Sequence, residues 1–383
     1  MRKKGLLLIP VILVGVYLAG PSPATPVYSK EMPVVPADPA GLDAYVAHNE
    51  AQHKLKPDNE ARIVWAVDPG KLAAPPKGEA PKNGKVLLAP SVLRSDSPMV
   101  AQGADAIPDS LKHRTEYAIV YLHGFLASQG EGAPMHRDIA RKFGCNLYLS
   151  RLAEQGIDTV DQMVNLTADE YWESAKQALA IGEQLGKKVI LIGTSTGGSL
   201  ALQLAATFPD SIAGLILLSP NIAIHDPNAW VLNNHWGLMI ARKVNGGPYL
   251  KSPHDWGPKF RQYWYPESRL EGAVALEELL ETTMNKETFG KVRQPVAVFY
   301  YYKDEAHQDT TVKVSAMLTM FDQLGTPADR KYKQAFAEAG DHVICSPIRS
   351  REAEGVEMAV QKFMTEFLHV PLAGDSHSPA AGK

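Results

Sequence analysis

The sequence predicts an α/β fold in which helices cover both faces of a mostly parallel sheet. Short apolar runs alternate along the chain with stretches whose apolar residues recur at helical spacing. This alternation is typical of parallel strands that are buried on both faces. The composition, 45% hydrophobic and 21% charged, is that of a globular protein. In such a sheet we expect the ligand site beyond the carboxyl ends of the strands.

Eight apolar runs are predicted as strands, and helical stretches lie between most of them. The last predicted helix carries Val356, Val360, Phe363 and Phe367 at the spacing of a buried face. The predicted strands are Ala61–Val67, Lys85–Ala89, Glu116–Leu122, Cys145–Leu149, Lys188–Ile192, Gly214–Leu218, Pro295–Tyr302 and Lys331–Ala337. The predicted helices are Leu42–His53, Met135–Phe143, Ala168–Leu185, one that contains Met320, and Glu354–Leu368.

The first residues have the layout of a secretory signal. Arg2, Lys3 and Lys4 precede an apolar run that extends to Ala19. The run is slightly short for a full membrane span, so a cleaved signal peptide and a retained signal anchor are both open. We therefore expect an exported protein, periplasmic or secreted, with membrane association through this segment if it is retained in the inner membrane.

One long segment, His225 to Arg293, interrupts the alternation of strands and helices. It holds Trp230, Trp236, Trp256 and Trp264, which either fill a small core of their own or line a pocket. Insertions of this length are usually functional lids or small subdomains. The predicted division is a signal or anchor at 1–24, a linker and extension at 25–60, core at 61–224 and 294–370, a cap at 225–293 and a disordered tail at 371–383.

The net charge of −3 argues against a nucleic-acid-binding protein, because no basic stripe is present to neutralise phosphates.

The chain has two cysteines. Cys145 opens a predicted strand, whereas Cys345 follows a strand at the opposite edge of the sheet. Since bridging needs closely spaced backbones, we predict two free, buried thiols.

A serine stands at a predicted strand-to-helix turn, in the sequence Gly193-Thr-Ser195-Thr-Gly197. Gly-x-Ser-x-Gly arises by chance in roughly one chain of this length in ten, so the motif alone is weak. Its position is the setting of a nucleophile elbow, in which small neighbours allow a sharp turn. Ser195 is therefore predicted as a nucleophile, against the alternative of a small polar residue in a glycine-rich connection.

A serine nucleophile needs a histidine base and an acid that orients it. His342, in Gly-Asp-His, directly follows the last predicted strand and precedes the final helix. The loop after the penultimate strand offers Asp309 and Asp304, with Glu305 as a weaker third candidate. We favour Asp309, because a helix follows it shortly, and retain Asp304 as the alternative.

Two backbone N–H groups are needed to hold the oxyanion of an acyl-transfer intermediate. One is expected from Thr196, the residue after the nucleophile. The other is expected from Phe125, in His123-Gly124-Phe125 at the end of an apolar strand. Gly124 lets the backbone turn toward the site, and His123 is interpreted as a structural hydrogen-bonding residue.

These motifs, in this order, resemble those of the α/β-hydrolase superfamily. The stretch Tyr117–Pro220 is similar to carboxylesterases and monoacylglycerol lipases in particular, and the likeness extends over about Ala61–Leu368. It implies an eight-stranded sheet with a helical cap after the sixth strand. It also implies catalysis by Ser195, Asp309 and His342 without metal or cofactor. The sequence departs from the pattern at Thr196, where such lipases often have methionine, and in a longer acid loop.

The resemblance implies a serine hydrolase that cleaves small carboxylic esters through an acyl-enzyme. An amidase, aminopeptidase or acyltransferase could use the same three residues. A non-catalytic binding protein on the same fold is the alternative from another class, because fold alone does not determine activity.

Overall fold

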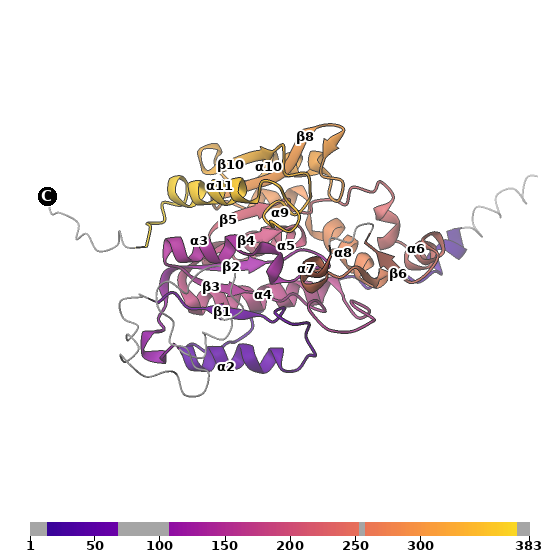
Figure 1. Ribbon diagram of the computed structural model, residues 1–383. Coiled ribbons are helices and arrows are strands. Elements are labelled where there is room, and N and C mark those ends of the chain that lie inside the picture. The colour runs from indigo at the N-terminus through magenta and orange to yellow at the C-terminus, as the bar shows by residue number, and fades with distance from the viewer. Residues whose placement is uncertain (1–13, 68–106, 253–256, 374–383) are drawn as a thin grey trace, which may run out of the picture.

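The fold is built around one mostly parallel β-sheet (Figure 1). The computed structural model describes residues 14–67, 107–252 and 257–373. Within these ranges the main sheet has eight strands in the order β1-β3-β2-β4-β5-β8-β10, with β9 paired to β8. Strand β1 pairs antiparallel with β3, and β9 with β8, whereas the other neighbours are parallel. The predicted fold class is therefore confirmed.

The described strands of the main sheet fall close to the predicted runs, with one addition. The two-residue strand β9 was not predicted, because so short a segment carries no periodicity. The predicted strand Lys85–Ala89 lies outside the described residues. The strands of the main sheet are β1 (Arg62–Val64), β2 (Thr115–Leu122), β3 (Asn146–Leu149), β4 (Gly186–Thr194), β5 (Ile212–Leu218), β8 (Val296–Asp304), β9 (His307–Gln308) and β10 (Lys331–Phe336).

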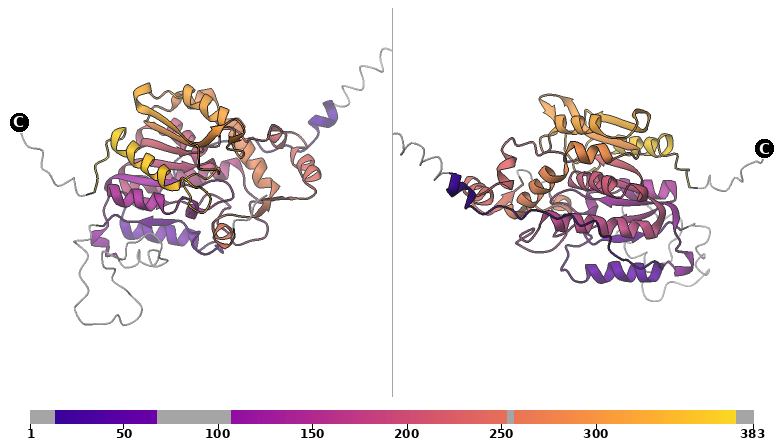
Figure 2. Two further views of the ribbon diagram at one scale, coloured as in Figure 1. Left: turned by 45° about the horizontal axis from the view of Figure 1, so that its top comes forward. Right: turned by 180° about the vertical axis from the view of Figure 1, so that it is seen from behind.

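Helices cover both faces of the sheet, which is why its strands are continuously apolar. Alternate residues of β2 point to opposite sides: Val120 packs in one core cluster and Tyr121 in the other. On one face lie α3 (Met135–Phe143) and α11 (Ala353–Glu366). The opposite face is covered by α4 (Ala168–Leu185), α5 (Thr196–Thr207) and α10 (Val314–Gln323). Figure 2 shows both layers from two further directions.

The N-terminal extension packs along α4 before it reaches the sheet. The indole N–H of Trp172 donates to the carbonyl oxygen of Ser29 at 2.7 Å, and Lys176 Nζ donates to that of Glu31 at 2.6 Å. The extension then forms α2 (Pro39–Glu50), whose first turn is capped by the side chain of Asp38. Seen from behind in Figure 2, this segment crosses the molecule from the end that carries residues 14–18 to α2.

Residues 225–252 and 257–293 add no strand to the main sheet. Helix α6 (Gly237–Asn245) stands to one side of the sheet, whereas α9 (Lys286–Lys291) packs against α5 and α10 (Figure 1). Two short strands pair with each other in a separate sheet. Trp230 is 56% exposed and Trp264 is buried, whereas Trp256 lies outside the described residues. The elements here are η8 (Ala229–Asn233), α6 (Gly237–Asn245), β6 (Tyr249–Lys251), α7 (Pro258–Tyr263), β7 (Glu267–Arg269), α8 (Leu270–Thr283) and α9 (Lys286–Lys291).

Both cysteines are free and buried, as predicted. The predicted signal or anchor at 1–24 lies largely outside the described residues, but residues 14–18 are helical. In the described part of the chain, no helix combines the length and the apolar character needed to cross a membrane.

Candidate active site

Ser195 occupies a strained turn between β4 and α5. Its backbone angles, φ 53° and ψ −117°, are rarely adopted by a residue with a side chain. Two backbone hydrogen bonds hold this conformation: the Ser195 N–H donates to the carbonyl oxygen of Leu218 at 2.9 Å, and the Ser195 carbonyl oxygen accepts from Asn221 N–H at 3.0 Å. The surrounding fold therefore imposes the strain, as expected for a nucleophile elbow.

The two glycines of the motif are required by close packing. A Cβ added at Gly193 would lie 2.5 Å from the carbonyl oxygen of Gly197. One added at Gly197 would lie 2.0 Å from that of Leu122 in β2. Any larger residue at either position would thus push the start of α5 away from the sheet. This explains in physical terms why small residues flank Ser195.

His342 is held by the carboxylate of Asp309. The Nδ1–H of His342 donates to Asp309 Oδ2 at 2.6 Å, and both side chains are buried. The other carboxylate oxygen, Oδ1, accepts from the N–H groups of Thr311 and Val312 at 2.8 and 3.1 Å. Asp309 is therefore fixed by its own loop, and it fixes the imidazole of His342 in turn.

Asp304 lies at the surface and pairs with His307 instead of His342. The antiparallel pairing of β9 with β8 turns it to the surface, where its Oδ1 accepts from the N–H groups of Ala306 and His307. Its side chain also pairs with the exposed imidazole of His307 at 2.8 Å. Glu305 accepts a hydrogen bond from Tyr302. The structure thus brings Asp309, and neither Asp304 nor Glu305, to His342.

The environment of His342 favours its protonated form. Burial alone would lower the pKa of its imidazole. The charge and hydrogen bond of Asp309, with a smaller contribution from Asp341, outweigh the effect of burial and raise the pKa above its usual value. The second ring nitrogen, Nε2, is buried and has no hydrogen-bond partner among the described residues. With Nδ1 carrying the proton toward Asp309, Nε2 is the nitrogen that can accept one.

Of the two residues predicted to hold the oxyanion, Thr196 follows Ser195 directly and Phe125 belongs to a loop that contacts Ser195. Thr196 is the first residue of α5, where N–H groups have no partner within the helix. A Cβ added at Gly124 would lie 3.2 Å from the Cβ of Ser195, so the loop that carries Phe125 passes directly alongside the serine. The half-buried Phe125 follows at the next position.

His123 uses both ring nitrogens to hold this loop. Its Nε2 accepts from Leu152 N–H at 3.0 Å, and its Nδ1 donates to the carbonyl oxygen of Gly124 at 2.9 Å. Burial lowers the pKa of the ring to about 4. His123 is therefore neutral near pH 7, with both nitrogens committed to the backbone.

Sequence reasoning missed a buried carboxylate behind the same loop. Glu131 Oε1 accepts from Gly124 N–H at 2.5 Å and from the hydroxyl of Tyr121 at 3.2 Å. The hydroxyl oxygen of Tyr121 in turn lies 2.9 Å from that of Thr194, the residue before Ser195. Burial raises the pKa of Glu131 to about 7, although Gly124 N–H and the nearby His342 oppose the shift. Its position eight residues after His123 gave no periodic signal, so only the folded loop reveals it.

The inserted segment contacts two loops of this site. At its start, the His225 N–H donates to the carbonyl oxygen of Thr311, in the loop of Asp309, at 3.0 Å. Near its middle, Trp264 bridges Ala127, and the Tyr265 N–H donates to the carbonyl oxygen of Leu126 at 2.8 Å. The segment therefore braces the acid loop and the Phe125 loop together.

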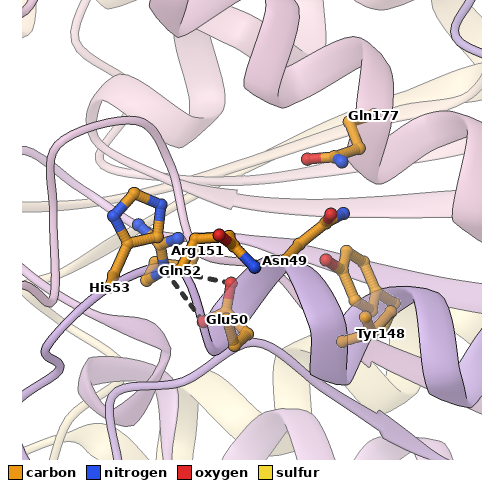
Figure 3. Close-up of a pocket in the computed structure, with 8 residues that line it drawn as sticks. Asn49, Glu50, Gln52, His53, Tyr148, Arg151 and Gln177 are labelled. Atoms are coloured by element: carbon orange, nitrogen blue, oxygen red, sulfur yellow. Dashed lines mark hydrogen bonds and ion pairs between the residues drawn. The ribbon is translucent and has the colours of Figure 1, made fainter.

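A polar cavity of about 260 Å³ opens between α2 and the end of β3 (Figure 3). The pair Arg151–Glu50, 2.8 Å apart, lies on its wall, and none of Ser195, Asp309 and His342 lines it. Since the lining charges are already paired, the cavity adds nothing to the chemistry of the strained serine. In the described part of the chain, no cluster of three or more histidine, cysteine, aspartate or glutamate residues could hold a metal ion.

Comparison with known proteins supports the α/β-hydrolase fold. Residues 117–240 match the family model for the alpha/beta hydrolase fold. No curated protein matches the sequence. A solved structure reported for the metagenome-derived lipolytic enzymes LipS and LipT superposes with a TM-score of 0.54 at 18% identity, covering 66% of this chain and 94% of that one.

Two further solved structures are similar at lower scores. A monoacylglycerol lipase from Paleococcus ferrophilus has a TM-score of 0.49 at 16% identity, over 68% of this chain and 97% of that one. Est1E from Butyrivibrio proteoclasticus, with ferulic acid bound, has a TM-score of 0.46 at 16% identity, over 69% and 93%. At such identities, similarity speaks for fold and leaves the reaction to be argued from the site.

Proposed function

We propose that this chain, which has the α/β-hydrolase fold, is a serine hydrolase that cleaves carboxylic esters through an acyl-enzyme. One observation carries the proposal. A strained serine after β4 shares the carboxyl edge of the sheet with a buried imidazole that is held by a carboxylate. Strain of this kind persists only where the surrounding structure enforces it, and it is concentrated at functional sites.

In the proposed mechanism, Ser195 Oγ attacks the acyl carbon of the ester while His342 Nε2 takes the hydroxyl proton. The N–H groups of Thr196 and Phe125 hold the negative oxygen of the tetrahedral intermediate. The ester C–O bond then breaks, and the alcohol leaves with the proton from His342. Water attacks the acyl-enzyme by the same route and releases the carboxylic acid. Asp309 keeps the ring oriented and stabilises the imidazolium throughout.

The choice of esters as substrate class rests on two supports. The loop that contacts Ser195 carries two half-buried apolar residues, Phe125 and Leu126, and an apolar loop suits an acyl group. The similar structure with the highest TM-score given above is described as lipolytic. We also propose, from the sequence of residues 1–24 alone, that the protein is exported.

Covalent labelling tests the proposal directly. A fluorophosphonate probe should label the wild-type protein and fail to label Ser195→Ala. The control is Ser315→Ala, which removes an exposed hydroxyl and should label like the wild type. Labelling of Ser195→Ala at the wild-type rate would refute the nucleophile.

A substrate panel then separates the reaction classes. Aryl esters of increasing chain length should be hydrolysed at least tenfold faster than the matching amino-acid anilides. Faster anilide cleavage would point to an amidase or aminopeptidase, and transfer to an added alcohol would point to an acyltransferase. Absence of both labelling and turnover would favour a binding protein.

A further inference from the structure

Exposed apolar side chains are concentrated at one end of the molecule. Elsewhere in the described chain they occur singly, as at Val160 and Met358. Isolated exposures of this kind are ordinary, whereas contiguous ones mark interaction surfaces. The concentrated set, called here the apolar end, comprises Val14, Val16, Tyr17, Leu18, Trp230, Met239, Ile240 and Val244, which are 43–83% exposed.

The two segments that form the apolar end are connected by hydrogen bonds. The Trp236 N–H donates to the carbonyl oxygen of Pro21 at 2.8 Å, and its indole N–H lies 3.1 Å from the carbonyl oxygens of Val16 and Tyr17. The Tyr17 hydroxyl donates to the side chain of Asn234 at 2.9 Å. The N-terminal segment is thus fastened to the residues directly before α6.

This junction is closely packed as well as hydrogen-bonded. A Cβ added at Gly20 would lie 2.0 Å from the indole nitrogen of Trp236, so only glycine fits beneath that ring. The rings of Tyr17 and His235 meet edge to face at a centroid distance of 5.1 Å. In Figure 1 the short N-terminal helix and α6 lie at the same end of the molecule. Residues 14–21 therefore form part of the same surface as α6.

The chain that leads into this surface indicates what covers it. Residues 5–13, Gly-Leu-Leu-Leu-Ile-Pro-Val-Ile-Leu, directly precede Val14, and Arg2, Lys3 and Lys4 stand before them. Helix α6 carries Arg242 and Lys243 and no acidic residue; Arg242 pairs with Glu271 of α8, whereas Lys243 is exposed. Apolar side chains with cations beside them fit the surface of an anionic bilayer, where the chains enter the lipid and the cations meet phosphates.

We propose that the apolar end docks on an anionic lipid bilayer, which holds the inserted segment at the membrane surface. The docking face is built by α6 together with residues 14–21. This goes beyond the proposed function and holds whether or not the protein hydrolyses esters. A second copy of the chain would also cover apolar side chains, and the experiment below distinguishes that case.

The two native cysteines are buried, so an introduced cysteine can be labelled selectively. Val244→Cys, on α6, is compared with Met358→Cys, which is 59% exposed on α11. Both full-length variants carry an environment-sensitive fluorophore and are mixed with vesicles of phosphatidylglycerol and phosphatidylethanolamine. The label at 244 should shift to shorter wavelength and be quenched severalfold by brominated lipids, whereas the label at 358 should not change.

Two results would overturn the proposal. A label at 244 that stays in water while the protein sediments with the vesicles would mean that the N-terminal segment binds alone. A label that becomes buried without vesicles as protein concentration rises would mean that a second copy covers the face.

A variant that introduces negative charge gives an independent test. Ile240→Glu combined with Val244→Glu should lower vesicle binding at least fivefold. The control, Val160→Glu combined with Met358→Glu, adds the same two charges at exposed apolar positions elsewhere. Thermal unfolding of all variants checks that each remains folded. Equal binding by the double variant and the control would contradict the docking face.

Discussion

At the scale of single residues, the two nitrogens of His342 have opposite surroundings. Nδ1 faces a carboxylate at 2.6 Å, whereas Nε2 is buried without a partner among the described residues. A buried nitrogen of this kind is costly unless it is used, since desolvation is not repaid by a hydrogen bond. This arrangement is expected of a general base whose Nδ1 is fixed by a carboxylate and whose Nε2 can accept a proton.

Replacing Asp309 with asparagine should separate the two candidate acids. The substitution keeps the shape but removes the charge, so the ring loses its orientation and its imidazolium loses its partner. We expect kcat to fall by about 10⁴-fold. Asp304→Asn, on the exposed hairpin, should retain activity within twofold. The reverse ranking of the two variants would show that the acid has been misassigned.

The same pair predicts a shift in pH dependence. Because the pKa of His342 is raised, wild-type kcat/KM should fall as pH drops through a value above 6.5. Without the Asp309 charge, burial dominates and lowers that pKa, so the residual activity of Asp309→Asn should persist to lower pH. A pH–rate profile of both proteins measures the shift. An unchanged acidic limb would argue against coupling between Asp309 and His342.

Glu131 is predicted to be a positioning residue for the Phe125 loop. Glu131→Ala removes the acceptor of Gly124 N–H, so the adjacent donor should lose its place and kcat should fall by about 10²–10³-fold with KM changed little. Glu131→Gln keeps an acceptor oxygen and should recover most of kcat. Steady-state kinetics and thermal unfolding of both variants distinguish this from simple destabilisation, which would lower Tm without a selective loss of kcat.

At the scale of elements, the β4–Ser195–α5 unit could be predicted because strand, glycines and helix are adjacent in sequence. The choice between the two aspartates in the loop after β8 could not be made in the same way. Asp304 and Asp309 both follow β8, and the two-residue strand β9 that turns Asp304 outward has no pattern of its own. Glu131 was missed for a similar reason, since its partner, Gly124 N–H, becomes its neighbour only when the loop closes. The catalytic roles of these residues remain predictions.

Helix α8 contains two buried carboxyl groups with unusual titration. Burial raises the pKa of Glu277 and of Glu278 to about 7 each, with further contributions from Glu281 and Asp169 respectively. Only 7% of Glu277 is exposed, and its Oε2 has no partner among the described residues. Below pH 4.5 the carboxyl group of Glu277 is protonated in both the folded and the unfolded chain. Between pH 4.5 and 7 it is protonated only in the folded chain, so the free energy of unfolding falls as pH rises.

Glu277→Gln should therefore stabilise the protein in a pH-dependent way. The gain in free energy of unfolding should be close to zero at pH 4.5 and reach about 1–3 kcal/mol at pH 8. Glu354→Gln, at an exposed position in the first turn of α11, serves as the control and should show no such rise. Urea unfolding at several pH values measures both. A constant difference across pH would mean that Glu277 does not titrate with folding.

At the scale of the whole molecule, the N-terminal extension connects parts that lie far apart in the sequence. It covers α4 through Trp172 and Lys176, and the hydroxyl of Tyr28 meets that of Thr282 in α8 at 2.6 Å. Glu50, at the end of α2, pairs with Arg151 beyond β3. Outside the predicted helix Leu42–His53, its proline-rich sequence carries no periodicity, so the sequence predicted a linker and surface extension but could not predict these partners.

Two truncations should show which part of this segment stabilises the fold. A chain that begins at residue 25 loses the contacts of residues 16–21 with Trp236 but keeps the cover on α4. It should lose at most about 1 kcal/mol of unfolding free energy, because the lost hydrogen bonds lie at an exposed surface.

A chain that begins at residue 39 also loses Tyr28, Met32 and Val35, which pack against the core beside α4. It also uncovers Lys176, which is only 1% exposed in the full chain. The cost of that uncovered apolar surface should be about 2–5 kcal/mol. Urea unfolding compares the two chains, and an equal loss in both would place the stabilising contacts at Trp236 instead of α4.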